Sequence, residues 1–175
     1  EDATASATVT ITPKAVTVTA NDKSKVYGTK DPTLDATVAG TLGTDTVTYT
    51  TSRVAGENVG KYTITPAGEA TQGNYSVTYA TGTLTITKAP AEQNAVTAGD
   101  YNKPYDAKAH GITASSAVTD GTTLYYSTDN ATWSETAPTW TDVTAAQTVY
   151  VKAVNANYED ATASATVTIT PKAVT

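Results

Sequence analysis

The sequence predicts an all-β protein built from two small modules in tandem. Threonine occurs forty times and tyrosine eleven times among 175 residues, and both favour strands. No stretch of ten residues carries a convincing helical stripe, although residues 32–40 could hold one short helical turn. Eight segments alternate a bulky apolar residue with threonine, serine or lysine, which places one row of side chains inward and one outward on a strand. These segments are 15–20, 45–50, 61–65, 74–80, 83–87, 123–127, 147–154 and 164–170.

The segments between the alternating stretches are rich in turn residues. "VYGTKDP" at 26–32 predicts the end of a strand followed by a glycine-permitted turn, with Pro32 holding Asp31 extended. We interpret this motif as a structural turn and not as a binding loop. "STDNATW" at 127–133 predicts the tip of a hairpin, because Asp129 and Asn130 both tolerate positive φ.

The alternating rows also predict the core. Tyr62 and Ile64 share one face of their segment, and the row of Tyr75, Val77 and Tyr79 shares one face of the next. Both two-sheet sandwich and β-grasp-like arrangements fit the first module. Trp133 is expected to pack back on the hairpin that precedes it.

The chain repeats its own beginning: residues 1–17 and 159–175 are identical, so a period of 158 residues is present. We interpret the chain as a window on a tandem array. A threonine-rich strand followed by a Lys-Ala step with a nearby proline closes each module, at 83–90 and at 166–173. The expected organisation is 1–14 as the terminal strand of a preceding repeat, 15–89 as the first module, 90–172 as the second module, and 173–175 as the start of the next repeat.

The repeated segment also predicts a partner. An unpaired alternating strand is a template for another chain, so residues 1–14 are expected to pair with a neighbouring identical repeat. They would do so either as the continuation of a polymer or by taking the place of residues 159–172 in another second module. Linkers of two to four residues with proline predict a stiff rod of modules.

Composition excludes several classes of protein. A net charge of −6 with eleven Lys and Arg residues and no basic stripe argues against nucleic acid as a partner. No run of about 18 apolar residues occurs, so no membrane span is expected. Because cysteine is absent, neither a disulfide framework nor a thiolate metal site can form.

The first module resembles the YGX type of MBG domain, a module repeated in bacterial surface proteins and adhesins. The resemblance rests on motifs spread over 15–89: Tyr27-Gly28, Asp31-Pro32, Gly56, Val59-Gly60-Lys61-Tyr62, Gly73-Asn74-Tyr75 and Leu84-Thr85-Ile86.

The second module resembles surface-protein repeats with a "YDG" signature. The similar stretches are 103–113, 124–143 and 149–170. It departs from that signature at Ala107, where a glycine is usual, and at Asn130 in the turn after Asp129. Together the two resemblances imply a non-enzymatic, repetitive protein located outside the cell on a bacterial surface or in a surface filament. They identify no ligand.

Candidate chemistry is sparse. His110 is the sole histidine and lies in "AKAHGIT" with no serine in a nucleophile-elbow setting, so we expect a solvent-facing loop residue and no enzyme. Lys152 with Asn155 or Asn157 is the one set that invites an internal crosslink, but Lys152 falls on the polar alternate face. No cofactor is expected. Calcium is kept as a minor hypothesis, because loop carboxylates can bind it at the acidic turn residues Asp100, Asp106, Asp120, Asp129 and Asp142.

Two functions from different classes follow. In the first, the modules are a structural stalk or filament that needs only to be rigid, soluble and numerous. In the second, they are an adhesin that binds carbohydrate or another host ligand through aromatic side chains of the second module. The candidate ligand-binding residues are Tyr101, Tyr105, Trp133 and Trp140. The identity of the two 17-residue copies favours the stalk, because a recently duplicated array changes length and not specificity.

Overall fold

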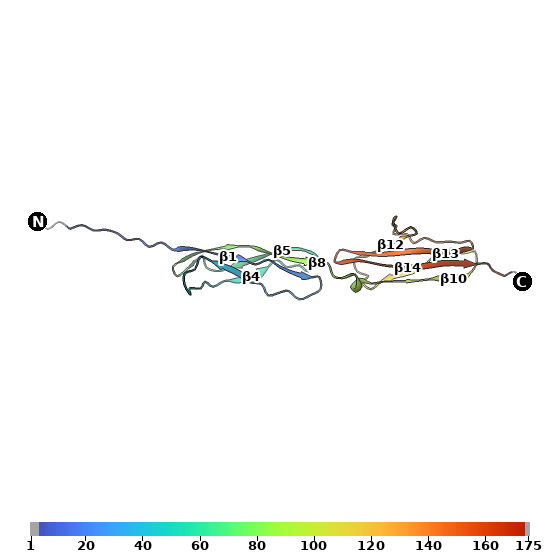
Figure 1. Ribbon diagram of the computed structural model, residues 1–175, viewed down its shortest axis with the longest axis horizontal. Coiled ribbons are helices and arrows are strands. Elements are labelled where there is room, and N and C mark those ends of the chain that lie inside the picture. Colours follow the sequence, from blue (N-terminus) through green and yellow to red (C-terminus); the bar gives the residue numbers. More distant parts are fainter. Residues whose placement is uncertain (1–3, 174–175) are drawn as a thin grey trace. The chain divides into compact units, whose positions relative to one another are not determined.

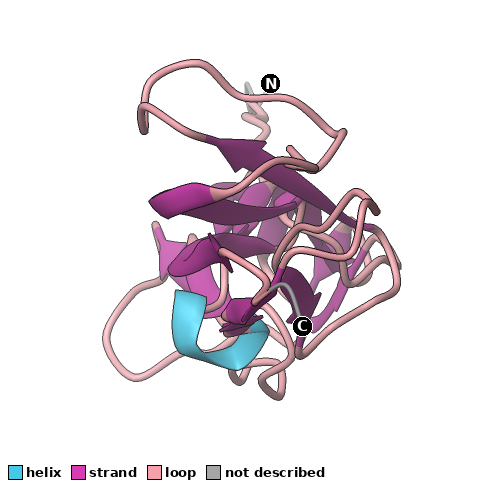
Figure 2. Cartoon of the chain, turned by 90° about the vertical axis from the view of Figure 1, so that its right-hand side faces the viewer, coloured by secondary structure: helices cyan, strands magenta, loops and turns pink. Residues whose placement is uncertain are grey.

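A computed structural model describes residues 4–173 of the chain. It divides into two compact units: one holds the residues up to Lys25 with Thr29–Ile86, and the other holds Val26–Gly28 with the residues from Thr87 onward. The predicted all-β class is confirmed, because nearly all of the regular structure is strand. Within the described residues the one helical segment is the short 3-10 turn η1 (Ala91–Asn94), cyan among the magenta strands in Figure 2.

The first unit is a β-sandwich of two four-stranded sheets, in the orders β3-β1-β7-β6 and β2-β8-β5-β4. β1 lies between β3, which is antiparallel to it, and β7, which is parallel to it over six residue pairs. The strands are β1 (Lys14–Ala20), β2 (Lys23–Val26), β3 (Ala36–Ala39), β4 (Thr50–Arg53), β5 (Gly60–Ala67), β6 (Thr71–Gln72), β7 (Tyr75–Ala80) and β8 (Gly82–Thr87).

The chain crosses between these sheets with very short breaks. Two residues separate β1 in one sheet from β2 in the other, and Thr81 alone separates β7 from β8. The chain enters the unit at the start of β1 and leaves it at the opposite end, where β8 finishes (Figure 1).

The core of the first unit follows the predicted alternation. Val16, Val18, Tyr75 and Val77 are buried in one cluster with Val47. Ile64, Leu84 and Ile86 are fully buried in the other sheet. Alternate apolar residues of β1, β5, β7 and β8 thus supply the apolar burial that stabilises a module of this size.

Two local expectations are wrong. The alternating segment 45–50 forms a strand only from Thr50. At Thr48 the side-chain amide of Gln72 forms the backbone hydrogen bonds that a neighbouring strand would otherwise form. Its Oε1 accepts from Thr48 N at 2.7 Å and its Nε2 donates to Thr48 O at 2.9 Å. The suggested helical turn within 32–40 is β3, because antiparallel pairing with β1 overrides the weak local preference.

The second unit has a four-stranded sheet in the order β10-β14-β13-β12 and a two-stranded sheet of β9 and β11. The long central strands β13 and β14 pair antiparallel, and β10 pairs parallel with β14. Asp100 alone separates β9 from β10. The strands are β9 (Val96–Gly99), β10 (Tyr101–Pro104), β11 (Thr113–Ser116), β12 (Thr122–Ser127), β13 (Thr144–Asn155) and β14 (Tyr158–Thr170).

The core of the second unit is small and aliphatic, and buried asparagine side chains form hydrogen bonds with the backbone of its loops. Val149, Val151, Val167 and Ile169 are each at most 1% exposed. The fully buried Asn94 accepts from Val118 N at 3.1 Å, which holds η1 against a turn more than twenty residues away. Hydrogen bonds of this kind offset the cost of burying an amide.

Residues 4–13 form no strand, and every one of them is exposed. Val9 and Ile11 keep 86% and 90% of their surface in contact with solvent. Residues 1–3 lie outside the described residues. The expected pairing of this segment with a neighbouring copy stays a prediction.

Candidate functional site

The four candidate aromatic residues do not all lie together in the second unit. Tyr101 begins β10, and its ring stacks on that of His110 with centroids 4.2 Å apart. Trp140 pairs with His110 through two backbone hydrogen bonds of 2.9 Å. Tyr105 follows β10 and is 36% exposed.

Trp133 lies apart from Tyr101. The Lys152 ammonium on β13 sits 4.5 Å from the centroid of its ring, while the expected packing on the preceding hairpin stays a prediction. In the sheet register Lys152 is opposite Thr162 and Tyr101 is opposite Val167, five residues farther along β14. That offset is about 17 Å at the rise of a strand. The four aromatic residues therefore do not form one stacking platform.

The expectation of a solvent-facing His110 is wrong. Its side chain is 20% exposed, and its Nε2 lies 2.7 Å from Asp106 Oδ1. The same Asp106 oxygen accepts from Lys108 N at 3.0 Å. The hydrogen bond from His110 is the main cause that lowers the pKa of Asp106. Tyr101 and Asp106 together hold the imidazole in place.

The Asp106 loop contains a strained residue, since Ala107 has φ +64°. Replacing Ala107 with Gly is expected to stabilise the second unit by about 0.5–1 kcal/mol, because relief of left-handed strain exceeds the added freedom of glycine in the unfolded chain. The matched control is Asn130→Gly, at φ +57°, where asparagine already tolerates this region and little change is expected. Urea unfolding followed by tryptophan fluorescence measures both. An unchanged midpoint for Ala107→Gly would show that the loop relaxes without strain.

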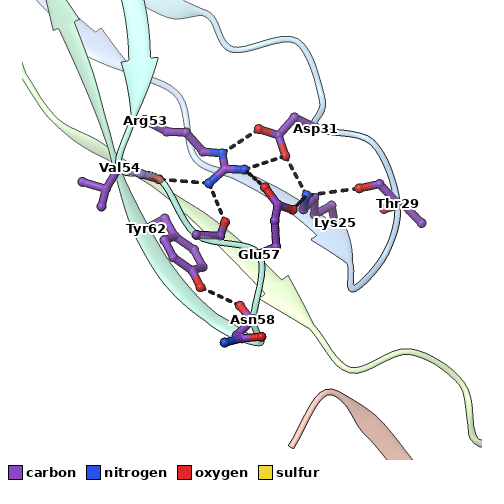
Figure 3. A network of polar contacts seen from close by, with 9 residues as sticks. Lys25, Thr29, Asp31, Arg53, Val54, Glu57, Asn58 and Tyr62 are labelled. Atoms are coloured by element: carbon purple, nitrogen blue, oxygen red, sulfur yellow. Dashed lines mark hydrogen bonds and ion pairs between the residues drawn. The ribbon is translucent and has the colours of Figure 1, made fainter. Parts of the chain in front are cut away.

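An ionic cluster in the first unit is the densest arrangement of charge in the described structure (Figure 3). It joins Lys25 on β2, Asp31 in the following loop, Arg53 at the end of β4, and Glu57 in the loop before β5. Lys25 Nζ is 2.7 Å from Asp31 Oδ1 and 2.5 Å from Glu57 Oε2. Arg53 Nε is 2.5 Å from Asp31 Oδ2, and its Nη2 contacts Glu57.

The cations are the buried partners of this ionic cluster. The side chains of Lys25 and Arg53 are 4% and 11% exposed, whereas Asp31 and Glu57 face solvent more. Hydrogen bonds from Arg53 and then Lys25 lower the pKa of Asp31 to about 2, and the hydrogen bond that Lys25 donates to Asp31 is the first cause that raises the pKa of Lys25. Each cation thus meets two anions, which satisfies charges that would be costly to bury alone.

Arg53 also organises the loop around Gly56. Its Nη1 donates to Val54 O at 2.9 Å and to Gly56 O at 2.7 Å, and its guanidinium lies 5.6 Å from the centroid of the Tyr62 ring. Tyr62 in turn donates its hydroxyl to Asn58 O at 2.8 Å. The ionic cluster therefore ties two loops to the sandwich, which agrees with a structural role for "VYGTKDP".

Sequence reasoning missed the ionic cluster. The one local signal was the spacing of Arg53 and Glu57, four residues apart, which indicates little outside a helix. Asp31 and Arg53 are 22 residues apart, and Lys25 and Glu57 are 32 apart. Only folding of the sandwich brings them together.

The ionic cluster predicts an acid-sensitive first unit. Asp31 has a folded pKa of about 2 against an ordinary value of 3.8, so its contribution to stability is complete above the ordinary value and is lost as the pH falls toward 2. The difference in thermal stability between the native chain and Asp31→Asn is expected to shrink over that window. Circular dichroism melts from neutral pH downward measure it. A difference that stays constant with pH would contradict this origin.

The other candidate groups have separate partners. Lys152 contacts Trp133, while Asn155 donates to Asp120 O at 3.0 Å and to Thr122 Oγ1 at 2.9 Å. Among residues 4–173 no three side chains of the His, Cys, Asp or Glu type lie close enough together to hold a metal ion. The calcium hypothesis stays a prediction. No helix in the described part of the chain has the length and apolar character needed to cross a membrane.

The fold and the loop geometry define the first unit as a β-sandwich module. The family model for the MBG domain (YGX type) matches residues 16–85, so the predicted resemblance of the first module is confirmed. The matched segment contains the whole ionic cluster. The resemblance of residues 90–172 to YDG-type repeats stays a prediction.

Two further comparisons concern curated proteins and solved structures. No curated protein matches it significantly. A solved structure of three titin immunoglobulin domains, in an E-to-A mutated variant, aligns over 90% of this chain with 12% identity and a TM-score of 0.29. The chain spans 64% of the length of that titin structure.

Proposed function

We propose that the chain is a structural repeat of an extracellular, adhesin-like bacterial surface protein, in which tandem β modules act as a load-bearing spacer. The observation that carries this proposal is the parallel pairing of an early strand with a late strand in each unit: β1 with β7 and β10 with β14. When two parallel strands are pulled by the N-terminal end of one and the C-terminal end of the other, they slide past each other. All of their hydrogen bonds then resist together.

The chain enters and leaves the second unit near opposite ends of its longest strand, β14. Ala89 pairs in parallel with Tyr158 at the start of β14, and the chain leaves at Thr170, twelve residues farther along that strand. This separation is about 40 Å at the rise of a strand. A module that the chain crosses from end to end adds its length to an array, which suits a spacer.

Single-molecule pulling tests the load-bearing role, and the lack of native cysteine allows the pulling points to be chosen. Cysteines replacing Lys14 at the start of β1 and Thr81 just after the end of β7 load these two strands in shear. Cysteines replacing Lys14 and Asn74 pull the same two strands from one end, because Lys14 is opposite Tyr75. We expect a several-fold higher unfolding force in the first geometry. Equal forces in the two geometries would contradict the proposal.

The competing hypothesis is a carbohydrate-binding adhesin that uses Tyr101, Tyr105, Trp133 and Trp140. A glycan array probed with the native chain, Trp133→Ala and Trp140→Ala separates the two. Retained fluorescence of the remaining tryptophan controls for folding in each variant. Saturable binding that is lost in these variants would overturn a purely structural role.

A further inference from the structure

Residues 4–13 have the sequence of a core strand but no core of their own. They match residues 162–171 letter for letter, at a constant offset of 158. In β14, Val167 is fully buried and Ile169 is 1% exposed, whereas Val9 and Ile11 are almost fully solvated. Two large apolar side chains at alternate positions of an extended segment are therefore exposed, where burial of each would stabilise by about 1.5–3 kcal/mol.

The place that this sequence fits is visible in the second unit. β14 lies between β13 and β10, so a segment in its position forms hydrogen bonds along both edges. Val167 is opposite Gln147 on β13 and opposite Tyr101 on β10. With the offset of 158, Val9 would occupy that position and Ile11 would occupy that of Ile169.

A polar contact sets the register. Asp100 Oδ1 accepts from Thr166 N at 2.6 Å and from Thr166 Oγ1 at 3.2 Å. The equivalent residue in the N-terminal segment is Thr8. A shift by one residue would lose these bonds and would turn Val9 and Ile11 away from the core.

We propose that residues 4–13 are a donor strand that completes the β10–β13 sheet of another copy of the second unit, with Val9 in the position of Val167. Pro13, the last residue of this donor strand, is followed directly by β1, which begins at Lys14. The sheet completed in one copy would thus continue into the first unit of the next through a single residue of fixed φ. This inference concerns the partner of the segment and does not depend on the load-bearing role.

The native chain already fills its own sheet. Only two residues, Ala156 and Asn157, connect β13 to β14, so the tethered strand competes at a very high effective concentration against a strand from another molecule. The isolated native chain is therefore expected to stay monomeric at micromolar concentration. Exchange should appear when β14 is disabled and the donor strand is intact.

Matched aspartate variants test the proposal, because the same substitution can be made in either copy of the segment. Val167→Asp disables β14 and is expected to convert the chain into head-to-tail oligomers, measured by light scattering. Val9→Asp alone should remain monomeric and folded. In the double variant the donor strand is disabled too, and oligomer formation should fall by more than about 100-fold.

Tryptophan fluorescence reports the second unit, since both tryptophans, Trp133 and Trp140, lie there. The double variant should lose the native spectrum, and a peptide with the sequence of residues 1–17 should restore it saturably. The same peptide with aspartate at position 9 should not. A monomeric Val167→Asp chain, or a double variant that the peptide does not restore, would overturn the proposal.

If Val167→Asp is insoluble, a pair of less disruptive alanine substitutions tests the same proposal. Ile169→Ala weakens β14 without placing a charge in the core, so concentration-dependent oligomers are expected. Adding Ile11→Ala weakens the donor strand equally and should reduce the oligomers by about tenfold or more. Equal oligomer formation by the single and double variants would contradict a role for residues 4–13.

Discussion

Ile169→Ala is expected to destabilise the second unit by about 2–5 kcal/mol, whereas Ile11→Ala should change stability by less than about 0.5 kcal/mol. The two residues lie in identical sequence, so local propensity is the same at both. Ile169 is buried on β14 and its truncation leaves a cavity, while Ile11 is 90% exposed. Any difference in stability between the variants therefore measures tertiary burial alone.

Urea unfolding at low micromolar protein concentration, followed by tryptophan fluorescence, measures this effect while exchange between molecules is suppressed. Val9→Ala is a second control, since Val9 is 86% exposed. Comparable losses for Ile169→Ala and Ile11→Ala would show that residues 4–13 are packed against the unit in solution, contrary to the structure.

Gly56→Ala is expected to destabilise the first unit by about 3 kcal/mol or more. An added Cβ would lie 2.2 Å from Cε1 of Tyr62, and the φ of +146° is strained for any residue with a side chain. Moving the Tyr62 ring would also disturb its contact with Arg53, and Gly56 O is itself an acceptor for Arg53. The substitution thus adds overpacking and loss of the ionic cluster to backbone strain.

The matched control is Gly43→Ala, where φ is +55° and nothing lies within 4 Å of the added atom. It should cost only the left-handed strain, about 1–2 kcal/mol. Thermal unfolding followed by circular dichroism compares the two variants. Equal losses would show that the close approach of Gly56 to Tyr62 has no energetic consequence.

Strands with bulky alternating residues could be predicted, and strands without them could not. β1, β5, β7, β8, β12, β13 and β14 each contain such a row. β3, β9 and β11 read "ATVA", "VTAG" and "TASS", with too little apolar surface to signal a strand alone. β3 forms because β1 provides a hydrogen-bonded partner, and β9 and β11 form because they pair with each other. A short stretch of sequence does not reveal such distant partners.

The candidate sites show the same limit. The four aromatic residues could be named from sequence, but their separation depends on which strand edge each one reaches. His110 looked exposed because its neighbours are small, yet Tyr101 stacks on it from nine residues away in sequence. The ionic cluster joins residues from two strands and two loops, and no spacing rule links them.

The sequence by itself determined the β class, the main strands, the glycine-permitted turn in "VYGTKDP" and the 158-residue repeat, because side-chain alternation and turn chemistry are local properties. Only the tertiary structure decided which strands pair, where the charges meet, and which copy of the repeated segment is buried. The same seventeen letters occur twice, and one copy is the core strand of a sheet while the described part of the other is solvated. A strand is stable only when neighbouring strands satisfy its backbone and cover its apolar row, and β10 and β13 provide that cover to one copy alone.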